Sequence, residues 1–254
     1  MNNRFKIDKI QISPVNLPDT LSIIDNTINK GQFNYICVTN SRTTYLANKD
    51  ESYCRIQNNS LLTLPDGAPL VWIAHNLGYN EVGKVSGKDL IDAIFEISEE
   101  KEYSHYFYGS TRRTIDLMRE KLLKKYPGLN IKGAVSPPFQ PLEDFDIDAL
   151  AEEINELQPT FFWCGLGAPK QERLIAVLQP KLQSTISVGV GLAFEYYAGT
   201  VHRAPRWMQN IGLESVYRLS QQPKNISRTI KPFSWIMIQV GASLKKKYIQ
   251  NNEI

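Results

Sequence analysis

Short runs of apolar, β-branched and aromatic residues alternate along the chain with longer segments whose apolar positions recur about every 3.6 residues. The short runs predict strands at Tyr35–Thr39, Ser60–Thr63, His105–Tyr108, Asn130–Ala134, Thr160–Gly165 and Thr185–Val190. The longer segments predict helices, for example at Ser41–Ala47, Ala68–Leu77, Lys88–Glu99, Thr111–Tyr126, Asp146–Leu157 and Pro169–Val177. This alternation predicts an α/β fold with a mainly parallel sheet flanked by helices.

The segments that follow the predicted strands are rich in glycine and in small polar residues. They are residues 39–41, 64–67, 109–111, 136–138, 165–172 and 189–191. Ligands of open α/β sheets bind outside the carboxyl ends of the strands. We therefore expect a nucleotide-sized ligand at this edge of the sheet.

The segment GLGAPKQE, residues 165–172, follows the apolar run TFFWC and leads into a predicted helix that opens at Pro169. Gly165 and Gly167 would let backbone N–H groups approach a diphosphate, and the helix N-terminus would favour its negative charge. Lys170 and Gln171 would add a cation and an amide. An ordinary strand-to-helix turn with a solvated lysine explains the same pattern.

Asp66 lies in a Pro-Asp-Gly turn between a predicted strand and an apolar helix. One interpretation is that it stabilises the turn or caps the helix. The other is that its carboxylate accepts the proton of an attacking sugar hydroxyl. Thr39 and Asn40 also end a strand, and they could either cap the next helix or bind a sugar.

Metal-binding patterns are weak in this sequence. Asp144, Asp146 and Asp148 form a DxD-like pattern, but acidic residues are common at the start of a helix. The three cysteines are widely spaced without a CxxC pair, and the three histidines have neither HxH nor HExxH spacing. We expect no histidine metal centre.

Composition changes this picture little until the C-terminal quarter of the chain. The 254 residues are 42% hydrophobic and 22% charged with a net charge of +3, which gives no case for nucleic-acid binding. We find no run suited to a signal peptide or to a membrane span of about 18 or more apolar residues. After residue 200, arginines are interleaved with tryptophan, and the stretch FSWIMIQVGASLKKKYIQ is apolar first and basic afterwards. Such a segment is suited either to an anionic membrane surface or to packing on the domain or on another subunit.

Several long motifs occur together in one order and cover roughly residues 35–230. The most specific are GLGAPKQE and the RAPRWMQ, GLE and YRL series, which accompany VTN, TLPDGAPLVW, VSGKDL, SPPFQPL and VGVGLAFEYYAGTVH. In these motifs the chain resembles the WecG/TagA/CpsF glycosyltransferase family. The resemblance implies a Rossmann-like catalytic domain over residues 1–200 and a C-terminal helical appendage over residues 201–254 that completes the active site near the membrane.

The resemblance also implies an inverting, metal-independent transferase without a cofactor. It would move a sugar, of the N-acetylmannosamine type or another hexose, from a UDP-sugar to an undecaprenyl-diphosphate-linked sugar. Teichoic acid, other cell-wall polymers and exopolysaccharides are the products of such enzymes. We expect a cytoplasmic protein, peripheral on the inner face of the cell membrane, and the sequence leaves open whether it forms a homo-oligomer.

Motif by motif, the resemblance assigns roles to individual residues. Asp66 would be the catalytic base, and Thr39 and Asn40 would line the sugar pocket. Gly165, Gly167, Lys170 and Gln171 would face the donor nucleotide, and Arg203, Arg206 and Arg218 would reach the diphosphate of donor or lipid. Lys84 stands where arginine is common in the family, and Glu195 where aspartate is expected. Both would bind substrate, with an altered sugar preference as the consequence.

Two other functional classes remain as alternatives. A dehydrogenase would need a GxGxxG motif after an early strand and an acidic residue about 20 positions later, and the early segment VTNSRT lacks it. A non-catalytic partner in a polysaccharide assembly complex would bind no uridine nucleotide sugar.

Overall fold

The structure is a computed structural model that describes residues 4–221 and 226–252. Its strands are β1 (Phe5–Ile7), β2 (Ile10–Ile12), β3 (Tyr35–Thr39), β4 (Leu62–Pro65), β5 (Ser104–Gly109), β6 (Asn130–Val135), β7 (Phe161–Gly165) and β8 (Ile186–Gly189). The first helices are α1 (Leu17–Asn29), α2 (Ser41–Lys49), α3 (Glu51–Asn59), α4 (Ala68–Asn76), α5 (Gly87–Ser98) and α6 (Arg112–Lys125). The later helices are α7 (Ile147–Leu157), α8 (Lys170–Leu178), α9 (Ala193–Ala198), α10 (Arg206–Asn210), α11 (Glu214–Gln221) and α12 (Ile226–Asn252). Short 3₁₀ turns lie at Leu142–Asp144 and Gln179–Lys181.

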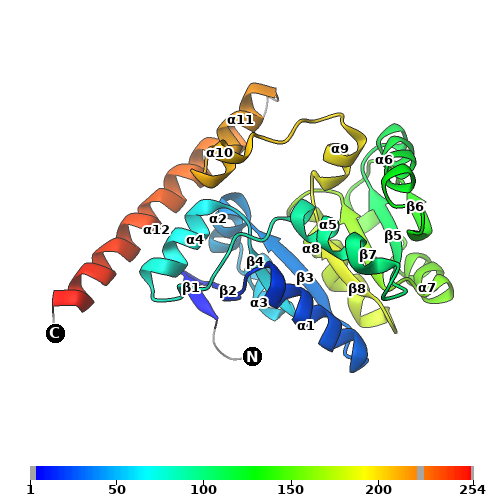
Figure 1. The fold of residues 1–254 in the computed structure, drawn as a ribbon, viewed down its shortest axis with the longest axis horizontal. Helices are drawn as coiled ribbons and strands as arrows, with labels where there is room; N and C mark the ends of the chain where they lie inside the picture. The colour runs from blue at the N-terminus through cyan, green and yellow to red at the C-terminus, as the bar shows by residue number, and fades with distance from the viewer. Residues whose placement is uncertain (1–3, 222–225, 253–254) are drawn as a thin grey trace. The chain divides into compact units, whose positions relative to one another are not determined.

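The larger sheet has six strands in the order β4-β3-β8-β7-β5-β6 (Figure 1). The pairs β3–β8, β8–β7, β7–β5 and β5–β6 are all parallel. Parallel neighbours need crossover connections, and helices supply them between the strands. The predicted fold class, a mainly parallel sheet flanked by helices with further helices at the C-terminus, is confirmed.

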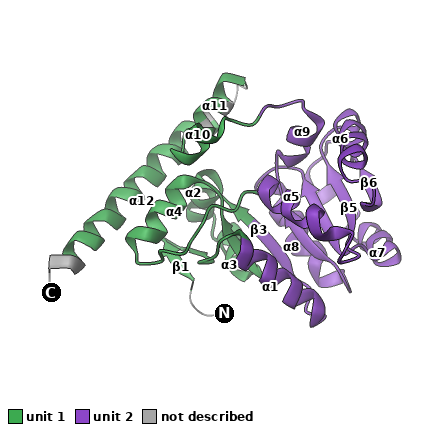
Figure 2. Ribbon diagram, in the orientation of Figure 1, with its two compact units in different colours: residues 1–17, 38–86, 203–254 green, residues 18–37, 87–202 purple. Residues whose placement is uncertain are grey.

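The chain divides into two compact units, which Figure 2 colours green and purple. Unit 1 comprises residues 1–17, 38–86 and 203–254, and unit 2 comprises residues 18–37 and 87–202. Each unit is described by itself below. The predicted domain boundary at residue 200 stays a prediction.

Unit 1 has a core to which its first and last segments both contribute. Ile10 and Ile12 of the β1–β2 hairpin are buried together with Ile73 of α4 and with Ile236 and Val240 of α12. The positions of Ile236 and Val240 are four residues apart, so both side chains lie on one face of α12. Asn76 at the end of α4 donates a hydrogen bond of 3.0 Å to the hydroxyl of Ser243 on the same helix. The middle of α12, from Ile236 to Ser243, is therefore held against α4.

Unit 2 has an aromatic core around strands β5 and β7. Phe107, Phe161 and Trp163 are at most 1% exposed. The indole N–H of Trp163 donates to Nδ1 of His105 at 3.1 Å, and Nε2 of His105 lies 3.0 Å from the Ser98 hydroxyl. His105 is thus a buried structural histidine.

None of the helices in the described part of the chain, α12 included, combines the length and apolar character needed to cross a membrane.

Candidate active site

Asp66 follows the last residue of β4 and precedes the helix α4. Its backbone N–H donates to the carbonyl of Thr39 at 2.7 Å, which joins it to the carboxyl end of β3. The N-cap of α4 is Gly67, with a φ of 116°, and no side chain forms a cap hydrogen bond there. Glycine alone adopts this backbone conformation readily. The half-buried carboxyl group of Asp66 therefore does not cap α4, so the capping alternative is wrong, while stabilisation of the turn stays an interpretation beside the catalytic one.

Asn40 caps α2, as the structural alternative predicted. Its side-chain oxygen accepts from the N–H groups of Arg42 and Thr43, and the Thr43 hydroxyl accepts from the Asn40 N–H. Thr39 is fully buried, and its hydroxyl donates to Oε1 of Gln57 at 2.5 Å. Both residues thus have local structural roles at the end of β3. A contact with sugar stays a prediction for each of them.

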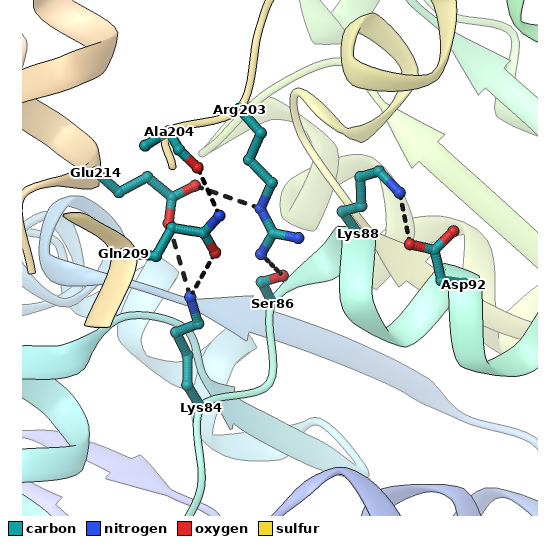
Figure 3. A network of polar contacts seen from close by, with 8 residues as sticks. All are labelled: Lys84, Ser86, Lys88, Asp92, Arg203, Ala204, Gln209 and Glu214. Atoms are coloured by element: carbon teal, nitrogen blue, oxygen red, sulfur yellow. Dashed lines mark hydrogen bonds and ion pairs between the residues drawn. The ribbon is translucent and has the colours of Figure 1, made fainter. Parts of the chain in front are cut away.

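Lys84 and Arg203 belong to a polar network within unit 1, shown in Figure 3. The Lys84 ammonium donates to Oε1 of Gln209 at 3.0 Å and lies 3.9 Å from the Glu214 carboxylate. Arg203 donates from Nη2 to the Ser86 hydroxyl at 2.9 Å, and its Nε also lies 3.9 Å from Glu214. One partly buried carboxylate therefore faces two cations.

The segment of Lys84 and Ser86 is fixed beside the end of β4. The N–H of Val85 donates to the carbonyl of Pro65 at 2.9 Å, one residue before Asp66. Lys84 and Asp66 thus lie on neighbouring backbone segments of the same unit. The network also contains Gln209 and Glu214. Neither was predicted as a site residue, although Gln209 lies in the RAPRWMQ motif and Glu214 in the GLE motif.

Two further predicted arginines lie in the same C-terminal segment. Arg206 is exposed and is the first residue of α10, after Pro205 as N-cap. Arg218 lies in α11, and its side chain is outside what the structure describes. Diphosphate binding by either residue stays a prediction. In Figure 3, Lys88 and Asp92 form a separate ion pair within α5 of unit 2.

In unit 2, the predicted donor segment Gly165–Glu172 forms the turn from β7 into α8. Gln171 is 3% exposed, and its Oε1 accepts from the N–H groups of Gly167 and Gly191, both at 3.0 Å. Gly167 has a φ of 80°. The amide of Gln171 therefore joins the loop after β7 to the loop after β8. Whether it also faces a donor nucleotide stays a prediction.

Lys170 is held by the segment between β6 and α7, which contains the SPPFQPL motif. Its ammonium donates to the carbonyl of Gln140 and lies 4.6 Å from the centre of the Phe145 ring. The cation is thus fixed near the N-terminus of α8, where an anion would also be favoured by the helix. This geometry is compatible with the predicted phosphate contact of Lys170.

Glu195 lies in α9, after the end of β8. Its Oε1 accepts from the Ser110 hydroxyl at 2.8 Å, whereas its Oε2 is buried without a hydrogen-bond partner among the described residues. Burial raises the pKa of Glu195, and the Ser110 hydrogen bond opposes that rise. A buried carboxyl oxygen without a partner is costly, and a ligand hydroxyl could satisfy it. Ser110 was not predicted as a site residue, although its place directly after a strand could have indicated it. In the structure its φ is 55°.

The acidic residues around α7 have structural roles. Asp146 is the N-cap of α7 and accepts from the N–H of Ala149 at 2.9 Å, and Asp148 pairs with Lys181 at 2.6 Å. Within residues 4–221 and 226–252, no group of three or more histidine, cysteine, aspartate or glutamate side chains is arranged to hold a metal ion. The helix-start interpretation is confirmed for Asp146 and Asp148, whereas Asp144 ends the short 3₁₀ turn before them.

A model of the glycosyl transferase WecG/TagA/CpsF family matches residues 5–249. The chain belongs to this family. The match covers parts of both units, and it includes the C-terminal segment of unit 1 from Arg203 to residue 249. The resemblance inferred from the motifs is confirmed, and the chain is a glycosyltransferase.

Similar members of the WecG/TagA/CpsF family have the printed name N-acetylglucosaminyldiphosphoundecaprenol N-acetyl-beta-D-mannosaminyltransferase. The protein from Bacillus subtilis (strain 168) is 27% identical over 188 residues, which cover 74% of this chain and 72% of the relative. The protein from Staphylococcus aureus (strain MW2) is 25% identical over 253 residues, which cover 97% of both chains. The similarity to the staphylococcal protein therefore includes the C-terminal helices.

Proposed function

We propose that this glycosyltransferase moves a sugar from a UDP-sugar to a polyprenyl-diphosphate-linked sugar, with Asp66 as the catalytic base. The names of the similar proteins support the acceptor class, since both name a diphosphoundecaprenol-linked N-acetylglucosamine. An N-acetylmannosamine-type sugar is the first candidate for the donor, and the polymer is a teichoic acid or another surface polysaccharide.

The observation that carries the proposal is the placement of Asp66. Its carboxyl group is half-buried directly after β4, its N–H is fixed to the end of β3, and α4 does not use it as a cap. Ligands of this fold class bind at the carboxyl ends of the strands. A carboxylate that is fixed at this edge lies where ligands of this fold class bind, and it can accept a proton from an attacking hydroxyl there.

The reaction is a single displacement at the anomeric carbon. The acceptor hydroxyl oxygen forms the new bond to that carbon, its proton passes to the Asp66 carboxylate, and the bond from the carbon to the diphosphate oxygen breaks. UDP leaves with the bonding electron pair. The configuration at the anomeric carbon is inverted because the attack and the departure occur on opposite faces.

Fixed positive charge stabilises the departing diphosphate in this proposal. Backbone N–H groups of the loop after β7 and Lys170 bind the donor diphosphate, as anions bind at helix N-termini. Arg203, with Lys84 beside it, binds a diphosphate of the donor or of the lipid, and Arg206 and Arg218 add further cations. Preorganised charge of this kind acts most strongly where water is excluded.

We further propose that the C-terminal helices bring the enzyme to the membrane that carries its lipid acceptor. Trp207 in α10 is 62% exposed, and several apolar side chains of α12 are also exposed. Lys245, Lys246 and Lys247 follow on the same helix and are exposed. Tryptophan favours the membrane interface, and lysines are attracted to anionic headgroups.

A screen of UDP-sugars tests this function. Each donor is incubated with the full-length protein and a short-chain polyprenyl-diphosphate-linked N-acetylglucosamine, and released UDP and the glycosylated lipid are both measured. We expect one UDP-sugar, of the N-acetylmannosamine type, to give both products in equal amounts. Release of UDP without a glycosylated lipid, or no turnover with any UDP-sugar, would contradict the proposal.

The same screen tests the expectation that no metal is needed. Transfer should continue unchanged after addition of EDTA, because protein cations take the place of a divalent ion. Loss of transfer in EDTA and its recovery with Mg²⁺ or Mn²⁺ would show that a metal stabilises the leaving group.

A further inference from the structure

We infer that Gln171 is a positioning residue, which holds the two glycine-containing loops after β7 and β8 in one joint conformation. The inference rests on the proposed function in one respect only, because it takes these loops to be the donor-binding part of the enzyme. Its geometric content is independent of any substrate. The loop after β7 contains Gly167, and the loop after β8 contains Gly191.

The acceptor atom of Gln171 serves both loops at once. Oε1 receives the Gly167 N–H and the Gly191 N–H at 3.0 Å each, which uses both of its lone pairs. If either loop rotated its peptide group away, a partly buried N–H would lose its acceptor, which costs free energy. A conformational change in one loop therefore affects the other, because both loops donate to this oxygen.

The donor atom of Gln171 fixes which way the amide faces. Nε2 donates to Oε1 of Glu172 at 2.8 Å, and Glu172 is 1% exposed. A carboxylate beside the NH₂ group excludes the flipped amide, in which two acceptors would face each other. Glu172 thereby ensures that the oxygen of Gln171, and not its nitrogen, points to the loops.

The sheet makes room for this side chain at the end of β8. A Cβ atom built on Gly189 would lie 2.8 Å from Nε2 and 3.2 Å from Cδ of Gln171. Any larger residue at this position would displace the amide. Gln171 thus lies directly over Gly189, the last residue of β8. The absence of a side chain at Gly189 therefore helps to hold the amide in place.

These contacts give Gln171 a function that differs from binding the donor itself. Both polar atoms of its side chain are already used within the protein, and the side chain is almost fully buried. What the side chain provides is one fixed arrangement of two loops, whose remaining N–H groups then face the ligand without reorganisation. Preorganisation of this kind improves binding by lowering its entropic cost.

The first experiment needs no substrate. Amide hydrogen exchange is measured by NMR for the Gly167 and Gly191 N–H groups in the wild type and in Gln171→Met, which keeps the length of the side chain but removes the acceptor. We expect both amides to exchange at least roughly tenfold faster in the variant. Gln179→Met is the matched control, because Gln179 is a buried glutamine of unit 2 that donates to the Thr185 carbonyl, which lies outside both loops.

The second experiment exchanges the two side chains. Gln171→Glu places a second carboxylate oxygen against Glu172, so it should repel and open the loops. The double variant Gln171→Glu/Glu172→Gln restores a donor opposite an acceptor, while an oxygen at position 171 still accepts both N–H groups. UDP binding is measured by calorimetry for each protein, and transfer kinetics are measured with the donor found in the screen.

The expected pattern is specific. Gln171→Glu should weaken UDP binding and raise KM by roughly tenfold, and the double variant should recover most of the binding and the slow exchange of both amides. Unchanged exchange of both amides in Gln171→Met would overturn the inference. So would a double variant that recovers slow exchange but not UDP binding, since the side chain would then contact the donor directly. If the wild type itself bound no UDP, the proposed function would fail, while the exchange data would still decide the role of Gln171.

Discussion

At the scale of single residues, local structure positions the polar side chains of the site, and partners distant in the sequence hold them. Asp66 lies between β4 and α4, as its Pro-Asp-Gly turn predicted, and Asn40 lies between β3 and α2, as the end of the preceding strand predicted. These positions depend on short-range patterns of apolar and small residues. The choice of partner depends on side chains that are distant in sequence, as with Lys84 and Gln209, which are 125 residues apart.

Gln171 is a clearer example of a side chain whose partners could not be identified from the sequence. Its glycine-rich context indicated a phosphate-binding turn, and nothing in that context indicates that the amide reaches Gly191 on a different loop, 20 residues later. Glu195 is a similar case, because its hydrogen bond with Ser110 joins residues that are 85 positions apart. Long-range polar contacts of this kind have no periodicity from which they could be inferred.

Because His105 is buried, we expect the stability of the protein to depend on pH. Burial lowers the pKa of His105 to about 3 in the folded protein. Between that value and the ordinary pKa of about 6.5, the unfolded chain takes up a proton that the folded chain excludes. Stability is therefore lost as the pH falls, by up to about 2 kcal/mol from this group between pH 7 and pH 5.

Urea unfolding at pH 7 and pH 5 checks this prediction in the wild type and in His105→Gln. The variant is expected to be less stable at pH 7, yet to lose less stability on acidification. Glu195 works in the opposite direction, because its pKa is raised by burial, and it contributes equally to both proteins. An identical loss of stability in the two proteins would show that His105 is not the group responsible.

Among the elements, the six strands of the main sheet were predicted, each to within about two residues, because apolar strands between glycine-rich turns have a strong pattern. The β1–β2 hairpin was not predicted, since each of its strands has 3 residues and offers little alternation. Helix α3 was also missed. Its sequence, ESYCRIQNN, is largely polar, and Asp50 both ends α2 and caps α3.

Helix α12 packs on the rest of unit 1 with one face, which is one of the two roles that its sequence left open. One face is buried in unit 1 through Ile236 and Val240. A second face carries Ile230, Met237 and Leu244, which are spaced by seven residues and are 53%, 38% and 52% exposed. Residues seven apart lie on one side of a helix, so these side chains form an apolar stripe. Packing within the domain is thus established for one face, and membrane contact stays a proposal for the other.

A charge placed on this stripe tests the membrane contact. Leu244→Glu should weaken sedimentation with anionic phosphatidylglycerol vesicles by at least about tenfold, since it removes one inserted apolar side chain and adds a repelled charge. Ala242→Glu adds the same charge on the opposite side of the helix, where the residue is also exposed, and should change binding much less. Equal vesicle binding by both variants and the wild type would show that the stripe does not contact lipid.

At the scale of the whole molecule, the sequence established the fold class and the family but not how the segments group into units. Unit 1 combines residues 1–17, 38–86 and 203–254. The apolar face of α12 could be recognised from its spacing, but an apolar face alone does not specify that α4 covers it. The family match over residues 5–249 covers nearly all of these segments, so the C-terminal helices are part of the glycosyltransferase.

The central claim, that Asp66 accepts the proton of the attacking hydroxyl, is tested most directly by the turnover of Asp66→Asn. Transfer to the polyprenyl-diphosphate-linked acceptor is measured with the donor found in the screen, together with UDP binding and thermal unfolding. We expect kcat to fall by about a hundred- to ten-thousand-fold, the typical effect of losing a general base, while UDP affinity and the unfolding temperature stay close to those of the wild type. A correctly folded variant that transfers sugar at a rate near that of the wild type would contradict the mechanism.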